Sequence, residues 1–110
     1  MKIETRDLKH VSVVKITGRV DSTTAPEMEK ALNQLVESDR NQVVLDLQDT
    51  DYMSSAGLRV LVSVLKSAKR NGGDLRLSQL SPRVKEVLDL AGLTPVFKIH
   101  TDVVEAVGSF

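Results

Sequence analysis

The stretch Asp51-Tyr-Met-Ser-Ser-Ala-Gly-Leu-Arg-Val-Leu-Val-Ser-Val-Leu65 has two hydroxyls, Ser54 and Ser55, directly before a strongly helical run. They therefore fall at the start of a helix, where backbone N–H groups lack intrahelical partners. A phosphoryl group on a serine there would bring about −1.5 to −2 charges to the positive end of the helix dipole. The alternative is that one of the two serines is only an N-cap, and spacing alone favours this interpretation.

A helix is predicted from Ala56 to about Arg70, ended by Asn71-Gly-Gly73, because apolar residues recur there at helical spacing. Its inward-facing side chains would be Leu58, Leu61, Val62, Leu65 and Ala68. Its outward-facing side chains would be Arg59, Ser63, Lys66 and Arg70. Val60 and Val64 flank the apolar stripe, so they are either additional core residues or part of a partner-binding edge beside Ser55.

The N-terminal part of the chain predicts a β-hairpin followed by a helix. Strands are expected at 3–6 and 11–17, and Gly18 is expected to end the second. After a polar loop, Thr24 and Glu27 have the spacing of a capping box at a helix start. A two-stranded antiparallel unit is thus expected before the first helix.

The segment 43–47 is a nearly continuous apolar strand, of the kind buried on both faces, and Asp46 is its exception. A buried carboxylate needs partners or a shifted pKa. Asp46 would either accept backbone N–H groups from the following loop or act in phosphate chemistry. In both cases we expect it near Ser54 and Ser55, because only a short loop joins the strand to the helix.

The C-terminal part alternates short strands and helices. A strand is expected at 75–77, a helix from Ser81-Pro82 to Gly92, and an edge strand at 95–99. A last helix is expected to begin at Thr101-Asp102, with an acidic residue in its first turn and Val103, Val104 and Val107 on its apolar side. If the strands are laid down in sequence order, right-handed crossovers place the main helices on one face of an α/β fold.

The amino-acid composition argues against several classes of function. The chain has 15 basic and 15 acidic residues, three aromatics and no cysteine, which argues against nucleic-acid binding and excludes a thiolate metal site. No segment approaches the ~20 apolar residues that span a bilayer, so cytoplasmic residence is expected. The two histidines, His10 and His100, are expected at the solvated surface and offer neither a catalytic triad nor a metal set. We therefore expect no enzyme and no bound metal or cofactor.

The run Tyr52-Met-Ser-Ser-Ala-Gly-Leu58 resembles the signature of STAS domains of the bacterial anti-sigma factor antagonist type, in which Asp-Ser-(Ser/Thr/Ala)-Gly-Leu begins a helix. Other matching segments are Gly18-Arg-Val-Asp21, Val43-Val-Leu-Asp-Leu47 and Leu90-Ala-Gly-Leu93. The resemblance implies one STAS domain over residues 1–110. Its mixed sheet would have four to five strands, with an antiparallel hairpin strand at the N-terminus and about four helices, mainly on one face.

Alignment on Gly57-Leu58 implies that Ser55 is the phosphorylated serine, with Ser54, where the family often has Asp, as the second candidate. The resemblance implies a cognate serine kinase that is also the anti-sigma factor, and a serine phosphatase that restores the unmodified form. ATP and Mg²⁺ would be bound by the kinase. The partner-binding residues would be Asp21, Ser22, Ser54, Ala56, Gly57, Arg59, Val60, Ser63 and Val64. Asp46 and Asp51 would be structural or lie beside the phosphate.

Two other functions remain open. The chain would alternatively be an accessory STAS subunit of a membrane transport or lipid-trafficking complex, in which the serines are structural and no kinase acts. A receiver-type domain phosphorylated on Asp is disfavoured, because the acidic cluster and later lysine of such a site are not evident. Asp21 itself would either contact a partner or bond to backbone N–H groups before the helix.

Overall fold

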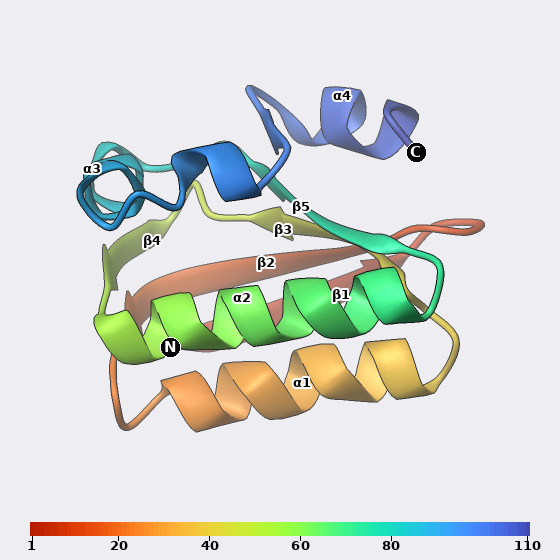
Figure 1. Ribbon diagram of the computed structural model, residues 1–110, viewed down its shortest axis with the longest axis horizontal. Helices are drawn as coiled ribbons and strands as arrows, with labels where there is room; N and C mark the ends of the chain where they lie inside the picture. Colours follow the sequence, from red (N-terminus) through yellow and green to blue (C-terminus); the bar gives the residue numbers. More distant parts are fainter.

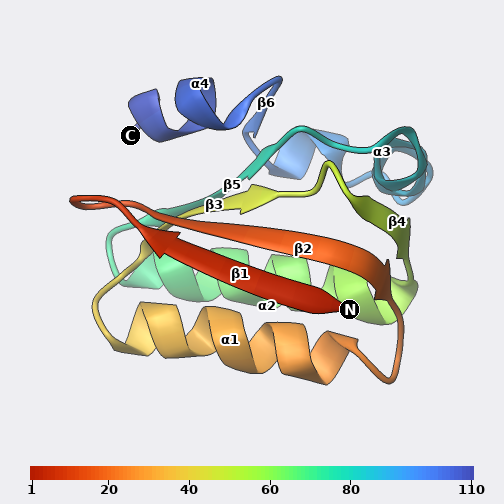
Figure 2. The ribbon, with the colours of Figure 1, turned by 180° about the vertical axis from the view of Figure 1, so that it is seen from behind.

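The first two strands form the antiparallel hairpin that the sequence predicts. The computed structural model describes residues 1–110, and in it β1 (Lys2–Asp7) pairs with β2 (Ser12–Val20). The register runs from Lys2 opposite Thr17 to Asp7 opposite Ser12. This places β1 at one edge of the sheet (Figure 2).

The remaining strands are parallel to their neighbours. The sheet has six strands in the order β1-β2-β3-β5-β6, with β3 at Gln42–Asp46, β5 at Asp74–Ser78 and β6 at Ile99–His100. The sixth, β4 (Thr50–Met53), pairs with the end of β2. The expected mixed α/β sheet is confirmed, with one strand more than expected.

Three helices cover one face of this sheet. They are α1 (Ala25–Glu37), α2 (Ser55–Arg70) and α3 (Pro82–Leu90), and α1 and α2 lie side by side along the strands (Figure 1). Their apolar side chains join those of the sheet in a core of 22 buried residues. The main core of the protein is therefore one-sided.

The short helix α4 (Val103–Gly108) packs on the other face (Figure 2). Its Ala106 is fully buried in a separate cluster with Val11, Val13 and Val44. The helix was expected to begin at Thr101-Asp102, but Asp102 is instead its N-cap and accepts a hydrogen bond from the Glu105 N–H at 2.7 Å. Val104 was expected on the apolar side but is 83% exposed, because Val103 and Val107 flank Ala106 against the sheet instead.

Two predicted boundaries in the chain are wrong. Gly18 does not end β2; it adopts φ +100° at a register shift, beyond which the strand continues to Val20 and pairs with β4. The expected edge strand at 95–99 is instead a 3₁₀ turn, η1 (Thr94–Val96), followed by the two-residue β6. The Thr94 hydroxyl donates to the Asp89 carboxylate, which holds this turn against the end of α3.

The two histidines differ in exposure. His10 is exposed, as expected. His100 is not: its side chain is 17% exposed, with Nδ1 3.0 Å from the Glu105 carboxylate. The contact with α4 leaves the His100 side chain only partly exposed.

Candidate functional site at the start of α2

The pairing of β2 with β4 brings two distant loops together. Val20 lies opposite Met53 in this parallel pair, so Asp21 and Ser54 leave the sheet at the same edge. The Ser54 N–H donates to the Val20 carbonyl at 2.9 Å, which ties the end of β2 to the first residues of α2.

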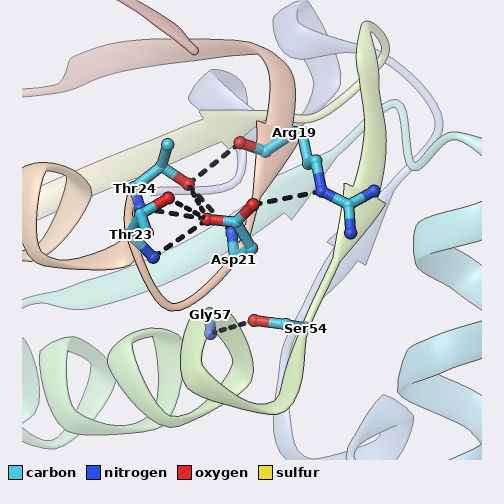
Figure 3. A network of polar contacts seen from close by, with 6 residues as sticks. All are labelled: Arg19, Asp21, Thr23, Thr24, Ser54 and Gly57. Atoms are coloured by element: carbon cyan, nitrogen blue, oxygen red, sulfur yellow. Dashed lines mark hydrogen bonds and ion pairs between the residues drawn. The ribbon is translucent and has the colours of Figure 1, made fainter.

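Ser54 and Ser55 have different roles in the helix start. Ser54 is the N-cap, with extended backbone, and its Oγ accepts a hydrogen bond from the Gly57 N–H at 3.4 Å (Figure 3). Ser55 is the first residue of α2, it is exposed, and its hydroxyl forms no hydrogen bond within the protein. The hydroxyl of Ser55 is therefore free at the positive end of the helix.

Gly57 allows α2 to approach the sheet closely. The residue is buried, and a Cβ atom built on it would lie 2.8 Å from Val20 Cγ1 and even closer to the Met53 sulfur. A glycine is thus required by packing, and Gly57 is not available as a partner-binding residue.

Asp21 organises the loop before α1. Its carboxylate accepts hydrogen bonds from the N–H groups of Thr23 (2.9 Å) and Thr24 (3.2 Å) and from the Thr23 hydroxyl (2.6 Å) (Figure 3). The Thr23 hydroxyl first, and then these backbone N–H groups, hold the pKa of the Asp21 carboxyl well below its usual range. The interpretation in which Asp21 bonds to backbone N–H groups before the helix is confirmed.

The predicted capping box at Thr24 is wrong. The Thr24 side chain makes no capping hydrogen bond, and its hydroxyl donates to the Arg19 carbonyl at 3.0 Å. The Asp21 carboxylate accepts the N–H groups of Thr23 and Thr24. The Glu27 N–H, which a capping threonine side chain would accept, donates instead to the Thr24 carbonyl at 3.1 Å.

Arg19 and Tyr52 also belong to this site, and the sequence interpretation missed both. The Arg19 guanidinium lies 4.0 Å from the centroid of the Tyr52 ring, and its Nε donates to Asp21 at 3.1 Å. Only their positions in the sequence could have indicated that they belong to the site. Arg19 lies inside Gly18-Arg-Val-Asp21, and Tyr52 lies two residues before Ser54.

Five of the predicted partner-binding residues line one shallow groove between α1 and α2, with a volume of about 310 Å³. They are Ser22, Ala56, Arg59, Val60 and Ser63. Val64 is wrong as a partner-binding residue, because it is fully buried in the main core. Val60 is also mainly a core residue, as the alternative interpretation expected, because only 6% of it is exposed.

The two acidic residues expected near the serines, Asp46 and Asp51, lie in different surroundings. Asp46 is buried and accepts the Gln48 N–H at 3.1 Å, which confirms that it bonds to the following loop. It follows Val44 on the sheet face that α4 covers, opposite the face that α2 covers, so the expectation that it lies beside the serines is wrong. Asp51 is exposed on β4 and lines a groove with Ser81 and Arg83. Asp46 is therefore outside the surroundings of Ser55, whereas the role of Asp51 as a structural or phosphate-neighbouring residue stays a prediction.

Comparisons with known proteins agree with this architecture. The family model of the STAS domain matches residues 2–106. BtrV of Bordetella bronchiseptica, named as an anti-sigma factor antagonist, is 34% identical over 110 residues, covering 100% of this chain and 95% of the relative. The anti-sigma-B factor antagonist of Listeria monocytogenes is 30% identical over 99 residues, covering 90% of this chain and 86% of the relative. A crystal structure from Thermotoga maritima, also named for an anti-sigma factor antagonist, superposes with a TM-score of 0.91 at 24% identity, covering 97% of this chain and 92% of that one. No helix combines the length and the apolar character needed to cross a membrane.

Proposed function

Because the chain belongs to the STAS domain family of anti-sigma factor antagonists, we propose that it is itself such an antagonist, controlled by phosphorylation of Ser55. The observation that carries the proposal is the exposed, unbonded hydroxyl of Ser55 beside a serine that already serves as the N-cap. In its unmodified form the chain binds a cognate serine kinase that is also the anti-sigma factor. A serine phosphatase reverses the modification.

Phosphorylation would release the partner through local electrostatics. The phosphate adds about −1.5 to −2 charges on Ser55, directly before Ala56, which lines the groove between α1 and α2 together with Ser22 and Val60. Burying that charge against a partner costs free energy, so the phosphorylated chain binds the partner more weakly than the unmodified chain. The chain is the substrate of this phosphoryl transfer, and the kinase supplies ATP, Mg²⁺ and the catalytic groups in the cytoplasm.

The test is phosphorylation of the purified chain by the cognate kinase with ATP, followed by intact mass and peptide mapping. We expect one added phosphate on Ser55, absent in Ser55→Ala and retained in Ser54→Ala, which is the matched control. A phosphate on Ser54 would refute the choice of hydroxyl. No phosphate at all, with an active kinase, would favour the accessory STAS subunit instead.

A further inference from the structure

A second groove runs along the outer side of α2, away from α1, and encloses about 440 Å³. We call it the basic groove. Its rim carries Ser55, Arg59, Lys66 and Arg70, and its floor includes Val62 of α2 and Leu93 from the segment after α3. From Ser55 to Arg70 the helix spans about 22 Å, long enough for about four turns of a bound helix or six to seven residues of an extended segment.

The cations of α2 have no partners within the protein. The helix has four basic residues and no acidic one. Elsewhere, seven of the chain's 15 lysines and arginines form ion pairs within 4.0 Å, and four of the other eight lie on α2. In a chain with formal net charge of zero, this is a local excess of positive charge.

Helix stability does not account for all of these cations. Lys69 and Arg70 lie in the last turn, where positive charge favours the helix dipole. Arg59 lies in the second turn of α2, far from the last turn in which the dipole favours a cation, and no carboxylate lies within 4.0 Å of it. The placement of Arg59 therefore points to a ligand outside the chain.

We propose that the basic groove binds an acidic segment of the protein partner, with apolar side chains between its carboxylates. The three exposed cations of the rim complement the carboxylates, and Leu58, Val62 and Leu93 supply an apolar floor. A nucleic acid fits less well, because no aromatic residue lines the groove for base stacking. This proposal rests on the proposed function only in taking the partner to be the anti-sigma factor.

The same groove connects the partner to the switch. Ser55 and Arg59 are four residues apart on α2, so a phosphate on Ser55 lies one turn from the Arg59 guanidinium. The phosphate and the acidic segment compete for Arg59, and the phosphate has the advantage of being attached to the same helix. Phosphorylation therefore removes one anchor of the partner and also adds repulsion.

The experiment measures binding of a fluorescein-labelled peptide, in which glutamates and leucines alternate at helical spacing, by anisotropy at about 50 mM salt. We expect saturable binding that weakens as salt rises, and at least about tenfold weaker binding to Arg59→Glu/Lys66→Glu. Lys69→Glu is the control, because Lys69 lies on the same helix outside the groove, and its affinity should stay within about twofold of the native value. The same peptide with lysine in place of glutamate should not bind.

Three results would overturn the proposal: no saturable binding, an equal effect of the Lys69→Glu change and the double change, or tighter binding of a single-stranded oligonucleotide in the same groove. The assay uses neither kinase nor ATP, so its failure leaves the phosphorylation of Ser55 intact. Conversely, a chain that no kinase modifies can still bind the peptide. If both proposals hold, the chain phosphorylated on Ser55 binds the peptide several-fold more weakly than the unmodified chain.

Discussion

Ser54 and Ser55 are adjacent, yet only the first contributes to the fold. The Ser54 hydroxyl accepts the Gly57 N–H, whereas the Ser55 hydroxyl has no partner within the protein. We expect Ser54→Ala to lower the free energy of unfolding by about 0.5–1 kcal/mol, since the helix loses its N-cap. Ser55→Ala should change it by less than about 0.5 kcal/mol. Urea denaturation of both variants measures this, and a larger loss for Ser55→Ala would contradict the assignment.

Asp21 predicts a dependence of stability on pH. Hydrogen bonds from the Thr23 hydroxyl and from backbone N–H groups lower its pKa in the folded state. A lowered folded-state pKa stabilises the protein above the unfolded pKa of about 3.9, and this stabilisation is lost as pH falls through the folded-state pKa. Native protein should therefore be more stable than Asp21→Asn above about pH 5, by a margin that shrinks below about pH 4. Urea unfolding of both proteins from pH 3 to 6 measures the margin; one that grows on acidification would be inconsistent with it.

At the site, the sequence predicted which residue types occur there more accurately than it predicted which of them are buried. Ser55 could be chosen over Ser54 only through the family resemblance, and the structure gives Ser54 the capping role that spacing allowed for either. Val64 could not be excluded from the partner-binding edge, because helical spacing alone does not show that α1 covers its side of α2. The contact between Arg19 and Tyr52 could not be predicted from the sequence, because it depends on the strand β4, and no sequence pattern predicted that strand.

The element α2 begins in close contact with β2 and β4, and Gly57 makes this contact possible. A methyl group at Gly57 would overlap the side chains of Val20 and Met53, both buried, so these side chains or the elements that carry them must shift. We expect Gly57→Ala to cost about 1–3 kcal/mol, despite the higher helix propensity of alanine. Thermal and urea unfolding measure the loss.

Gly108 provides the matched control for Gly57. It is also helical, in α4, but a Cβ atom there meets nothing within 4 Å. Gly108→Ala should therefore be neutral or slightly stabilising. Equal losses at the two positions would mean that overlap with Val20 and Met53 does not decide the effect.

Long elements with strong periodicity were predictable, and short ones were not. The helix α2 was expected within one residue of its observed start, and Ser81 caps α3 as expected, accepting the Val84 N–H at 3.3 Å. The strand β4 was missed because its four residues combine Thr, Asp, Tyr and Met without alternation. Its position depends on a tertiary contact, in which the buried Thr50 hydroxyl donates to the Ile16 carbonyl at 2.8 Å.

On the scale of the whole molecule, the two faces of the sheet are covered unequally. The face under α1, α2 and α3 belongs to a core of 22 residues, whereas the other has a cluster of four, covered by α4. The C-terminus is also held by Arg76, whose guanidinium lies 4.0 Å from the Phe110 ring and donates to Ser109 at 2.7 Å. Because few apolar contacts hold it, α4 should be the least stable helix of the fold.

This difference in burial predicts separate unfolding of α4. Ala106→Asp places a carboxylate among Val11, Val13 and Val44. The cation beside Val44 on this face, Arg76, is already paired with Asp74 at 3.0 Å, so we expect α4 to detach at a cost of roughly 2–4 kcal/mol. In hydrogen exchange monitored by NMR, the amides of α4 should lose protection while those of β3, β5 and α2 keep theirs. The control Val104→Asp lies on the same helix at a position that is 83% exposed, and it should leave exchange unchanged. If Ala106→Asp instead abolished protection throughout the sheet, α4 would be part of the cooperative core, because the small cluster would then be coupled to the large one through β2 and β3.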